Sequence, residues 1–377
     1  MGSAYVPGLK VSADTDLHLE RRLPLKGEVV VQVGQEVSWD TVVAKTNLPG
    51  SVSMVNIAAM LGVEPSEVPE CMLKAQGDAV GKGEGLARSK GFFGYFRSTL
   101  EAPISGTVES ISGVSGQVVI RAQAEPVEVC AYVNGVVERC LENEGVVIAS
   151  RGVLIQGIFG IGGETSGRLS VLANSPDQPL KPEDISEKDR DCVVVGGSLA
   201  TNAVLHKAIS CGVKGLVVGG IDDKDLRDFL GYDLGVAITG SENKGITLII
   251  TEGFGEIPMS ERTFALFLEH VGDFASMSGA TQIRAGVIRP EIIIPRHPLN
   301  LNAQPCDHKA PTTEPFCPGA RVRLIREPHF GALATVINLP VQPVQIPTGA
   351  KVRVAEIELT DGERMVIPRA NLELLEG

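Results

Sequence analysis

The residues best suited to chemistry lie in four short loops rich in glycine and polar side chains. Their sequences are GGS (196–198), GGIDD (219–223), TGSEN (239–243) and TEGFGE (251–256). Each follows an apolar run that predicts a strand, and ligands of open α/β sheets collect at the carboxyl ends of strands, beside helix N-termini. This pattern predicts a rim for a small anion or nucleotide. The candidate residues are Gly196, Gly197, Ser198, Thr201, Gly219, Gly220, Asp222, Thr239 and Glu252.

The side chains of this rim suggest two kinds of ligand and one structural alternative. Ser198, Thr201 and the amides of a first helical turn could hold an anion. Asp222, Asp223 and Glu252 could instead hold a ribose hydroxyl, a cation or a basic side chain. The alternative is that the glycines supply positive φ in tight turns and the Ser or Asp residues are N-caps.

The sequence offers no recognisable catalytic set. No Gly-x-Gly-x-x-Gly or Walker sequence occurs, and no His, Cys and Asp residues have the spacing of a nucleophilic centre. We therefore expect no catalytic residue and no cofactor, and the sequence favours a protein that is not an enzyme.

Three potential metal ligands lie close together near the C-terminal third. Cys306, His308 and Cys317 have the spacing Cys-x-His-x8-Cys, and soft ligands so close could begin a zinc site. A fourth ligand would have to come from elsewhere, with His297 nearest in sequence. Coincidence within a loop is the favoured interpretation, so no metal is expected.

Four aromatic rings are concentrated within five residues of the first block. They are followed by an arginine, and such a group forms the centre of many protein interfaces. The segment is therefore a candidate partner-binding tip, although the rings could instead cover the open end of a small barrel. The residues are Phe92, Phe93, Tyr95, Phe96 and Arg97.

The elements that must position these residues fall into three blocks. The chain has 377 residues and two segments rich in proline and polar residues, 174–191 and 295–318, which predict linkers. The blocks are then 1–173, 192–294 and 319–377. Short alternating runs between glycines predict a β-rich first block, and a helix is expected over 53–62. Apolar strands alternating with amphipathic helices predict a three-layer α/β second block with a mostly parallel sheet. The third block returns to β, so the fold class is multi-domain α+β.

The net charge and the number of cysteines limit the kinds of partner and cellular location that are expected. A net charge of −12 argues against attraction of the whole molecule to nucleic acid or anionic lipid. No long apolar run predicts a membrane span, and the N-terminal residues lack a secretory pattern. Seven cysteines without a compact framework are typical of reduced thiols, so a cytoplasmic location is expected. Arg284 and Arg289 are expected to pair with the chain's own carboxylates, or else to bind an anion or a partner's carboxylate.

Two sets of residues in the first block resemble the half-motifs of the biotinyl/lipoyl-like hairpin family. Gly77, Asp78, Val80, Gly83, Leu86 and Ala87 match one half, and Ala102, Pro103, Gly106 and Val108 match the other. The resemblance implies a barrel-sandwich hybrid within 1–173. The family's carriers present a modified lysine in a short signature between the halves. Here the longer segment SKGFFGYFRSTL (89–100) occupies that place, and Lys90 lies outside such a signature. No covalent biotin or lipoate is therefore expected.

The third block resembles the KOW motif of ribosomal proteins and transcription elongation factors. Gly319, Val322, Leu324, Ile325, Gly331 and Val336 fit its pattern of glycine, strand, loop, glycine and strand. The resemblance implies a small SH3-like barrel that contacts RNA, a ribosome, RNA polymerase or another protein. The contacting face would hold Arg321, Arg323, Arg326, His329 and Phe330. Residues 318–377 carry seven basic and seven acidic side chains, so a protein partner is favoured over RNA.

Three functions remain open after these observations. The missing catalytic set and the several β modules favour a non-catalytic scaffold or assembly protein that binds protein partners. The KOW-like end favours a factor of transcription or translation. The rim favours a protein that binds a small anion or nucleotide.

Overall fold

The central feature of the fold is one large mixed sheet whose strands are drawn from residues 11 to 295 of the chain. The computed structural model describes residues 9–89, 98–232, 244–281, 288–296, 316–324, 329, 332–345, 351–360 and 362–374. Within these residues the fold is mainly β, with several sheets and a few short helices, as expected for an α+β protein of several domains. None of the helices in the described ranges is long and apolar enough to cross a membrane.

The central sheet contains both parallel and antiparallel strands. Its order is β14 (Phe159–Ile161), β19 (Thr247–Phe254), β18 (Gly215–Ile221), β16 (Cys192–Val195), β15 (Glu164–Val171), β20 (Phe274–Ser278), β21 (Glu291–Pro295), β13 (Gly145–Gln156), β12 (Gly135–Leu141) and β3 (Glu36–Val37). The run from β19 to β15 is parallel, and the other neighbours pair antiparallel. The short strand β17 (Leu199–Ala200) pairs with β18, and β1 (Val11–Arg22) pairs with β13.

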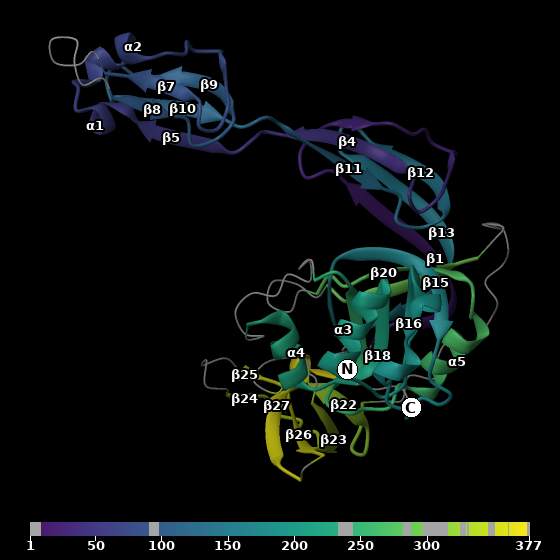
Figure 1. The fold of residues 1–377 in the computed structure, drawn as a ribbon. Coiled ribbons are helices and arrows are strands. Elements are labelled where there is room, and N and C mark those ends of the chain that lie inside the picture. Colours follow the sequence, from purple (N-terminus) through teal and green to yellow (C-terminus); the bar gives the residue numbers. More distant parts are fainter. Residues whose placement is uncertain are drawn as a thin grey trace.

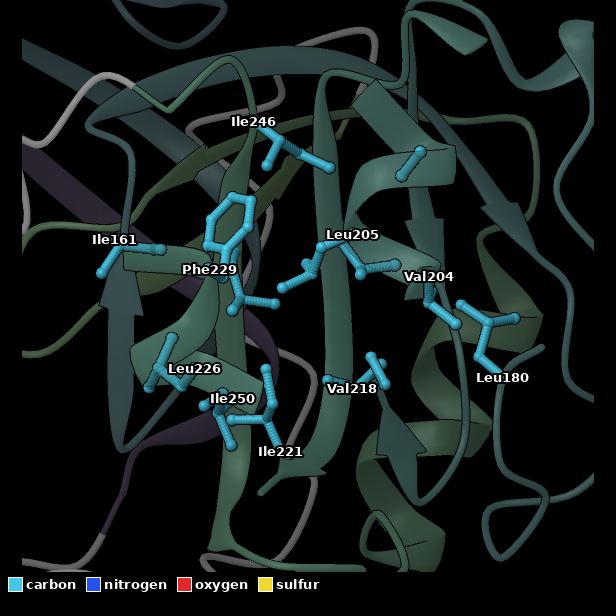
Figure 2. Close-up of a cluster of buried hydrophobic side chains, with 14 of the residues drawn as sticks. Ile161, Leu180, Val204, Leu205, Val218, Ile221, Leu226, Phe229, Ile246 and Ile250 are labelled. Carbon is cyan, nitrogen blue, oxygen red and sulfur yellow. The ribbon is translucent and has the colours of Figure 1, made fainter. Parts of the chain in front are cut away.

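Helices pack on both faces of the parallel part of this sheet. Alternate strand residues point to opposite faces. Val194, Val218 and Ile250 share one buried cluster with helices α3 (Asn202–Cys211) and α4 (Asp223–Leu230), and Figure 2 shows this cluster. Val193, Val195, Val217 and Ile249 form a second cluster with helix α5 (Glu261–Glu269). Left-handed glycines, Gly212 and Gly231, end α3 and α4.

The predicted boundary at 174–191 does not separate two bodies. Strand β15 precedes this segment and β16 follows it, yet the two pair in parallel within the central sheet. The segment itself holds the short helices η2 (Pro182–Asp184) and η3 (Glu187–Asp189), and buries Leu180 and Ile185 in the core. Its polar composition is explained by exposed short turns, with two apolar side chains anchoring it.

Residues 123–144 and the N-terminal strands form an arm that leaves the central sheet. Strands β4 (Val42–Leu48), β11 (Glu125–Cys130) and β2 (Glu28–Val29) make a three-stranded sheet beside the ends of β1, β12 and β13. Its core includes Val31, Val43 and Val133. Figure 1 shows this arm between the central sheet and a separate distal lobe.

The distal lobe, residues 49–122, has a core of its own. A four-stranded sheet has the order β5 (Val52–Asn56), β10 (Gln117–Arg121), β9 (Gly106–Ile111) and β6 (Ala79–Val80). A hairpin of β7 (Gly85–Arg88) and β8 (Thr99–Glu101) and the helices α1 (Ile57–Leu61), η1 (Pro65–Glu67) and α2 (Val68–Cys71) complete it. The predicted helix over 53–62 begins later, because Ser53 to Asn56 pair with β10 and Asn56 then caps α1.

The C-terminal domain is a five-stranded antiparallel sheet beside the central one. Its order is β27 (Arg364–Pro368), β26 (Val354–Leu359), β23 (Leu333–Asn338), β22 (Arg321–Leu324) and β28 (Leu372–Leu374). Strands β24 (Val344–Gln345) and β25 (Lys351–Val352) form a small separate pair, and η4 (Arg369–Asn371) precedes β28. Residues 297–315, most of the second predicted linker, lie outside the described ranges.

Candidate functional site

The glycines of the predicted rim are packed against the chain's own backbone. A Cβ atom on Gly197 would lie 2.3 Å from the Gln178 oxygen, and one on Gly219 would lie 2.2 Å from the Ile257 oxygen. One on Gly220 would lie 2.0 Å from the Gly255 oxygen, whereas Gly196 is closely flanked by Leu180 and Val218 side chains. These residues are glycines because two backbones approach closely. The space beside them is filled, so they do not line an open ligand cleft.

The polar residues of the rim do not converge either. Ser198 is buried, and its hydroxyl donates to the Asp177 carbonyl at 2.8 Å. Thr201 and Asp222 hold the N-cap positions of α3 and α4 without a side-chain cap bond. Thr239 lies outside the described residues. The polar residues of this loop set thus make separate local contacts. The four candidate glycines do not have the positive φ that the structural alternative assumed, because their role is close packing.

Glu252, the last rim residue, faces the C-terminal domain. Its Oε1 accepts from the Ser260 amide at 3.0 Å, and its Oε2 accepts from Arg323 Nη2 at 3.0 Å. Arg323 also lies beside Glu373, with 3.6 Å between Nη1 and Oε2. Arg289 Nη2 donates to the other oxygen of Glu373 at 3.0 Å. Two arginines and two glutamates thus meet where the C-terminal domain contacts the central one.

This charge cluster is almost completely removed from water. The Arg323 side chain is 0% exposed, and that of Glu373 is 1% exposed. Burial lowers the pKa of Arg323, and the nearby carboxylates oppose that change. Burial likewise raises the pKa of Glu373, opposed by Arg289 and Arg323. The expected pairing with a carboxylate of the chain is confirmed for Arg289, whereas Arg284 lies outside the described residues. We interpret the cluster as the contact that holds the two domains in register.

The basic face predicted for the KOW-like domain is therefore not one surface. Arg323 is buried within the chain, which corrects its expected role as an exposed contact residue. Arg321 is exposed and His329 is partly exposed. Arg326 and Phe330 lie outside the described ranges, as does Gly331. The exposed basic face of this domain therefore lacks Arg323, which the sequence had placed on it.

Of the three candidate metal ligands, only one lies in the described part of the chain. Cys317 is partly buried, whereas Cys306 and His308 belong to the ranges that the structure does not describe. Among the described residues, no group of three or more His, Cys, Asp or Glu side chains is arranged to hold a metal ion.

The half-motif residues of the first block all lie in the distal lobe. Gly77 and Gly83 have positive φ at turns, and Leu86 and Ala87 are buried in the lobe's core. A Cβ on Gly106 would lie 2.1 Å from the Arg121 oxygen, so this glycine permits a close crossing. Ala102 and Val108 are also buried in this core.

The same lobe exposes several large apolar side chains. Val114 is 93% exposed and Met60 is 60% exposed, and Leu73 is also exposed. The predicted tip residues Phe92, Phe93, Tyr95, Phe96 and Arg97 lie outside the described ranges. They belong to the segment that connects β7 to β8. At the ends of this segment the Ser89 amide donates a hydrogen bond to the backbone carbonyl of Ser98. The lobe is therefore a unit with its own hydrophobic core and with large apolar side chains exposed on its surface.

A further polar cluster, at the base of the arm, was not predicted from the sequence. Arg21 donates to both oxygens of Glu164 at 2.7 Å, and its guanidinium lies 5.2 Å from the ring centre of Tyr132. The Ser276 hydroxyl donates to the backbone carbonyl oxygen of Tyr132 at 2.5 Å. Burial raises the pKa of nearby Glu291, as does the charge of Glu164. These residues come from five distant segments, so no local spacing could have revealed the cluster.

No protein-family model matches the chain, and a search of curated proteins found no match.

Proposed function

We propose that the chain is a non-catalytic assembly protein that presents its distal lobe to a protein partner. The observation that carries this proposal is the position of the lobe. It has its own core and stands away from the central sheet on the arm (Figure 1). A module held at such a distance is accessible from several sides.

The chemistry of the lobe supports a protein as the partner. Exposed apolar residues such as Met60 and Val114 lose unfavourable contact with water when a partner covers them. The aromatic segment that joins β7 and β8 would add rings and an arginine, the residue types that dominate protein interfaces. The lobe is also close to electrically neutral, so broad attraction to nucleic acid is not expected of it.

The fold of each of the three parts of the chain is a further element of the proposal. We infer that the lobe is a barrel-sandwich hybrid, that residues 192–294 are the helix-bearing part of a three-layer α/β domain, and that the C-terminal sheet closes as an SH3-like barrel. In this arrangement the α/β and C-terminal parts form a fixed base, joined by the Arg323 cluster. A cytoplasmic location fits the unpaired cysteines.

Site-specific photo-crosslinking in the native cell tests the proposal. A photoreactive amino acid at Val114 in the lobe is compared with one at Val341, which is 88% exposed in the C-terminal domain. We expect one protein to be crosslinked from Val114 and not from Val341. The purified partner must then bind the full chain, and Val114→Lys must weaken that binding. Equal capture from both positions, or no binding by the purified protein, would contradict the proposal.

A further inference from the structure

Strand β5 forms an open edge of the distal lobe. It pairs with β10 on one side, and no strand of the described residues pairs with it on the other. Its sequence is Val-Ser-Met-Val-Asn, without a charged residue or a proline. Exposed edges are usually protected against pairing with another chain by charges, prolines, bulges or short length. This edge has none of those protections.

The other edges of the described sheets are protected. Strands β2, β3, β6, β17, β24 and β25 have two residues each, β8, β14 and β28 have three, and the four-residue β7 ends in a charged residue, Arg88. The longer edge strands β1, β11 and β27 carry charges, and the last two also carry prolines: Asp14, Asp16 and Glu20 in β1, Glu125, Pro126 and Glu128 in β11, and Arg364 and Pro368 in β27. The difference makes β5 the edge best suited to accept a strand.

The register of β5 shows which backbone groups are free to pair. The Ala122 amide donates to the Ser51 oxygen at 2.9 Å, immediately beyond the paired residues Arg121 and Val52. Hydrogen-bonded positions alternate along an antiparallel pair. Ser53 therefore directs its amide and carbonyl toward β10, whereas Val52 and Met54 direct theirs outward. Their side chains are also open, at 48% exposed for Val52 and 71% for Met54.

The distribution of charge favours a second copy of this chain as the occupant. Residues 49–122 carry six Lys and Arg against seven Asp and Glu, whereas residues 145–317, on the other side of the arm, carry 15 against 21. The acidity of the protein is thus concentrated away from the lobe, and the arm holds the lobe apart from it (Figure 1). Two copies that meet through their lobes keep their acidic parts separated, which limits electrostatic repulsion.

We propose that β5 pairs antiparallel with β5 of a second copy, across a two-fold axis at Met54. In this pairing Met54 lies opposite Met54, and Val52 lies opposite Asn56. No charged residue is brought to the interface by the strand itself, and the same residues serve both copies, as a two-fold interface requires. The dimer uses the β5 edge, whereas Val114 of the proposed partner contact lies in the turn between β9 and β10.

The mass of the full chain in solution tests this pairing. Sedimentation equilibrium over a wide concentration range should show a dimer for the wild-type chain. Met54→Lys places two like charges at the axis, and Met54→Pro removes the outward amide, so both should shift the equilibrium to monomer. Val114→Lys is the matched control and should stay dimeric. Circular dichroism and thermal melting establish that each variant is folded.

Disulfide trapping tests the register independently. Residues opposite each other in a hydrogen-bonded pair have Cα atoms about 5.5 Å apart, within disulfide range. Mild oxidation of Met54→Cys should give a covalent dimer beyond the wild-type background, and Val114→Cys should not. A wild-type chain that is monomeric at every concentration overturns the proposal. So does a dimer that is unchanged by Met54→Lys, or a β5 edge that becomes protected from hydrogen exchange only when a different protein is added.

Discussion

Arg323 Nη2 lies 3.0 Å from Glu252 Oε2, although 71 residues separate the two in the chain. The sequence assigned Arg323 to a basic contact face and Glu252 to a ligand rim. In the structure the two form an ion pair, and both contribute to the contact between the C-terminal and central domains. The pairing explains why neither predicted surface is complete.

Replacing Arg323 should destabilise the protein strongly. Arg323→Met leaves Glu373 buried with Arg289 as its remaining cationic neighbour, and loss of one member of a buried ion pair costs about 3–5 kcal/mol. Urea unfolding followed by circular dichroism measures the change. Arg321→Met is the matched control, because this exposed side chain is two residues away on the same strand, and a change within about 0.5 kcal/mol is expected. Equal effects of the two substitutions would contradict the interpretation.

The packing of the rim glycines gives a second prediction. Gly219→Ala places a Cβ 2.2 Å from the Ile257 oxygen, and relieving that overlap should cost about 1–3 kcal/mol. Gly81→Ala is the control, because its Cβ has the Glu84 carboxylate 3.6 Å away as its nearest contact. The free energy of unfolding should fall only for Gly219→Ala. Thermal shift with nucleotides should also show no stabilisation, and a reproducible shift that Gly219→Ala abolishes would restore the ligand rim.

Local pattern predicted the elements of the central domain well. The apolar runs at 192–195, 215–221 and 247–254 are strands, and the helices between them end at left-handed glycines. The predicted domain boundary at 174–191 was wrong because strands that pair in one sheet can lie on opposite sides of such a segment in the sequence. Strand β15 lies among short alternating runs that suggest an independent β module, yet its neighbours β16 and β20 are later in the chain.

The candidate site was less predictable for a related reason. Alternation along β22 correctly separates Val322 and Leu324, which are buried in the domain's own core, from Arg321 and Arg323. Alternation shows that Arg323 lies on the outer face, but it contains no information on whether another domain covers that face. The polar cluster around Tyr132 depends in the same way on β1, β15 and β21 meeting in three dimensions.

Glu291 should make stability depend on pH in a defined direction. Burial raises its pKa above the ordinary value of 4.5, so the folded state binds the proton more tightly than the unfolded state. This contribution is fully present below pH 4.5 and is lost as pH rises through the folded-state pKa. Glu291→Gln cannot lose a proton, so its free energy of unfolding should rise relative to wild type as pH increases from 4 toward neutrality.

The control for this measurement is Glu28→Gln, whose side chain is 67% exposed. Its difference from wild type should vary little over the same pH series. Glu164 and Arg21 are the charged groups that act on Glu291, and they are unchanged in both variants. A constant difference between wild type and Glu291→Gln across the series would show that the carboxylate is not perturbed.

Removing the hydroxyl of Tyr132 should leave stability unchanged or raise it. This oxygen is buried and has no hydrogen-bond partner among the described residues, and a buried hydroxyl without a partner costs about 1–3 kcal/mol. Tyr132→Phe removes that cost and keeps the ring beside Arg21, whereas Tyr132→Leu loses the contact between the cation and the ring and should be less stable than the Phe variant.

The opposite result for Tyr132→Phe would also be informative. A loss of more than about 1 kcal/mol would mean that the hydroxyl makes a hydrogen bond in solution. Glu291 and Glu164 are the acidic groups that act on Tyr132 electrostatically, with Glu291 the stronger. Combining Tyr132→Phe with Glu291→Gln in a double-mutant cycle then identifies the acceptor. Additive effects exclude Glu291, and a coupling that grows as Glu291 ionises assigns the bond to its carboxylate.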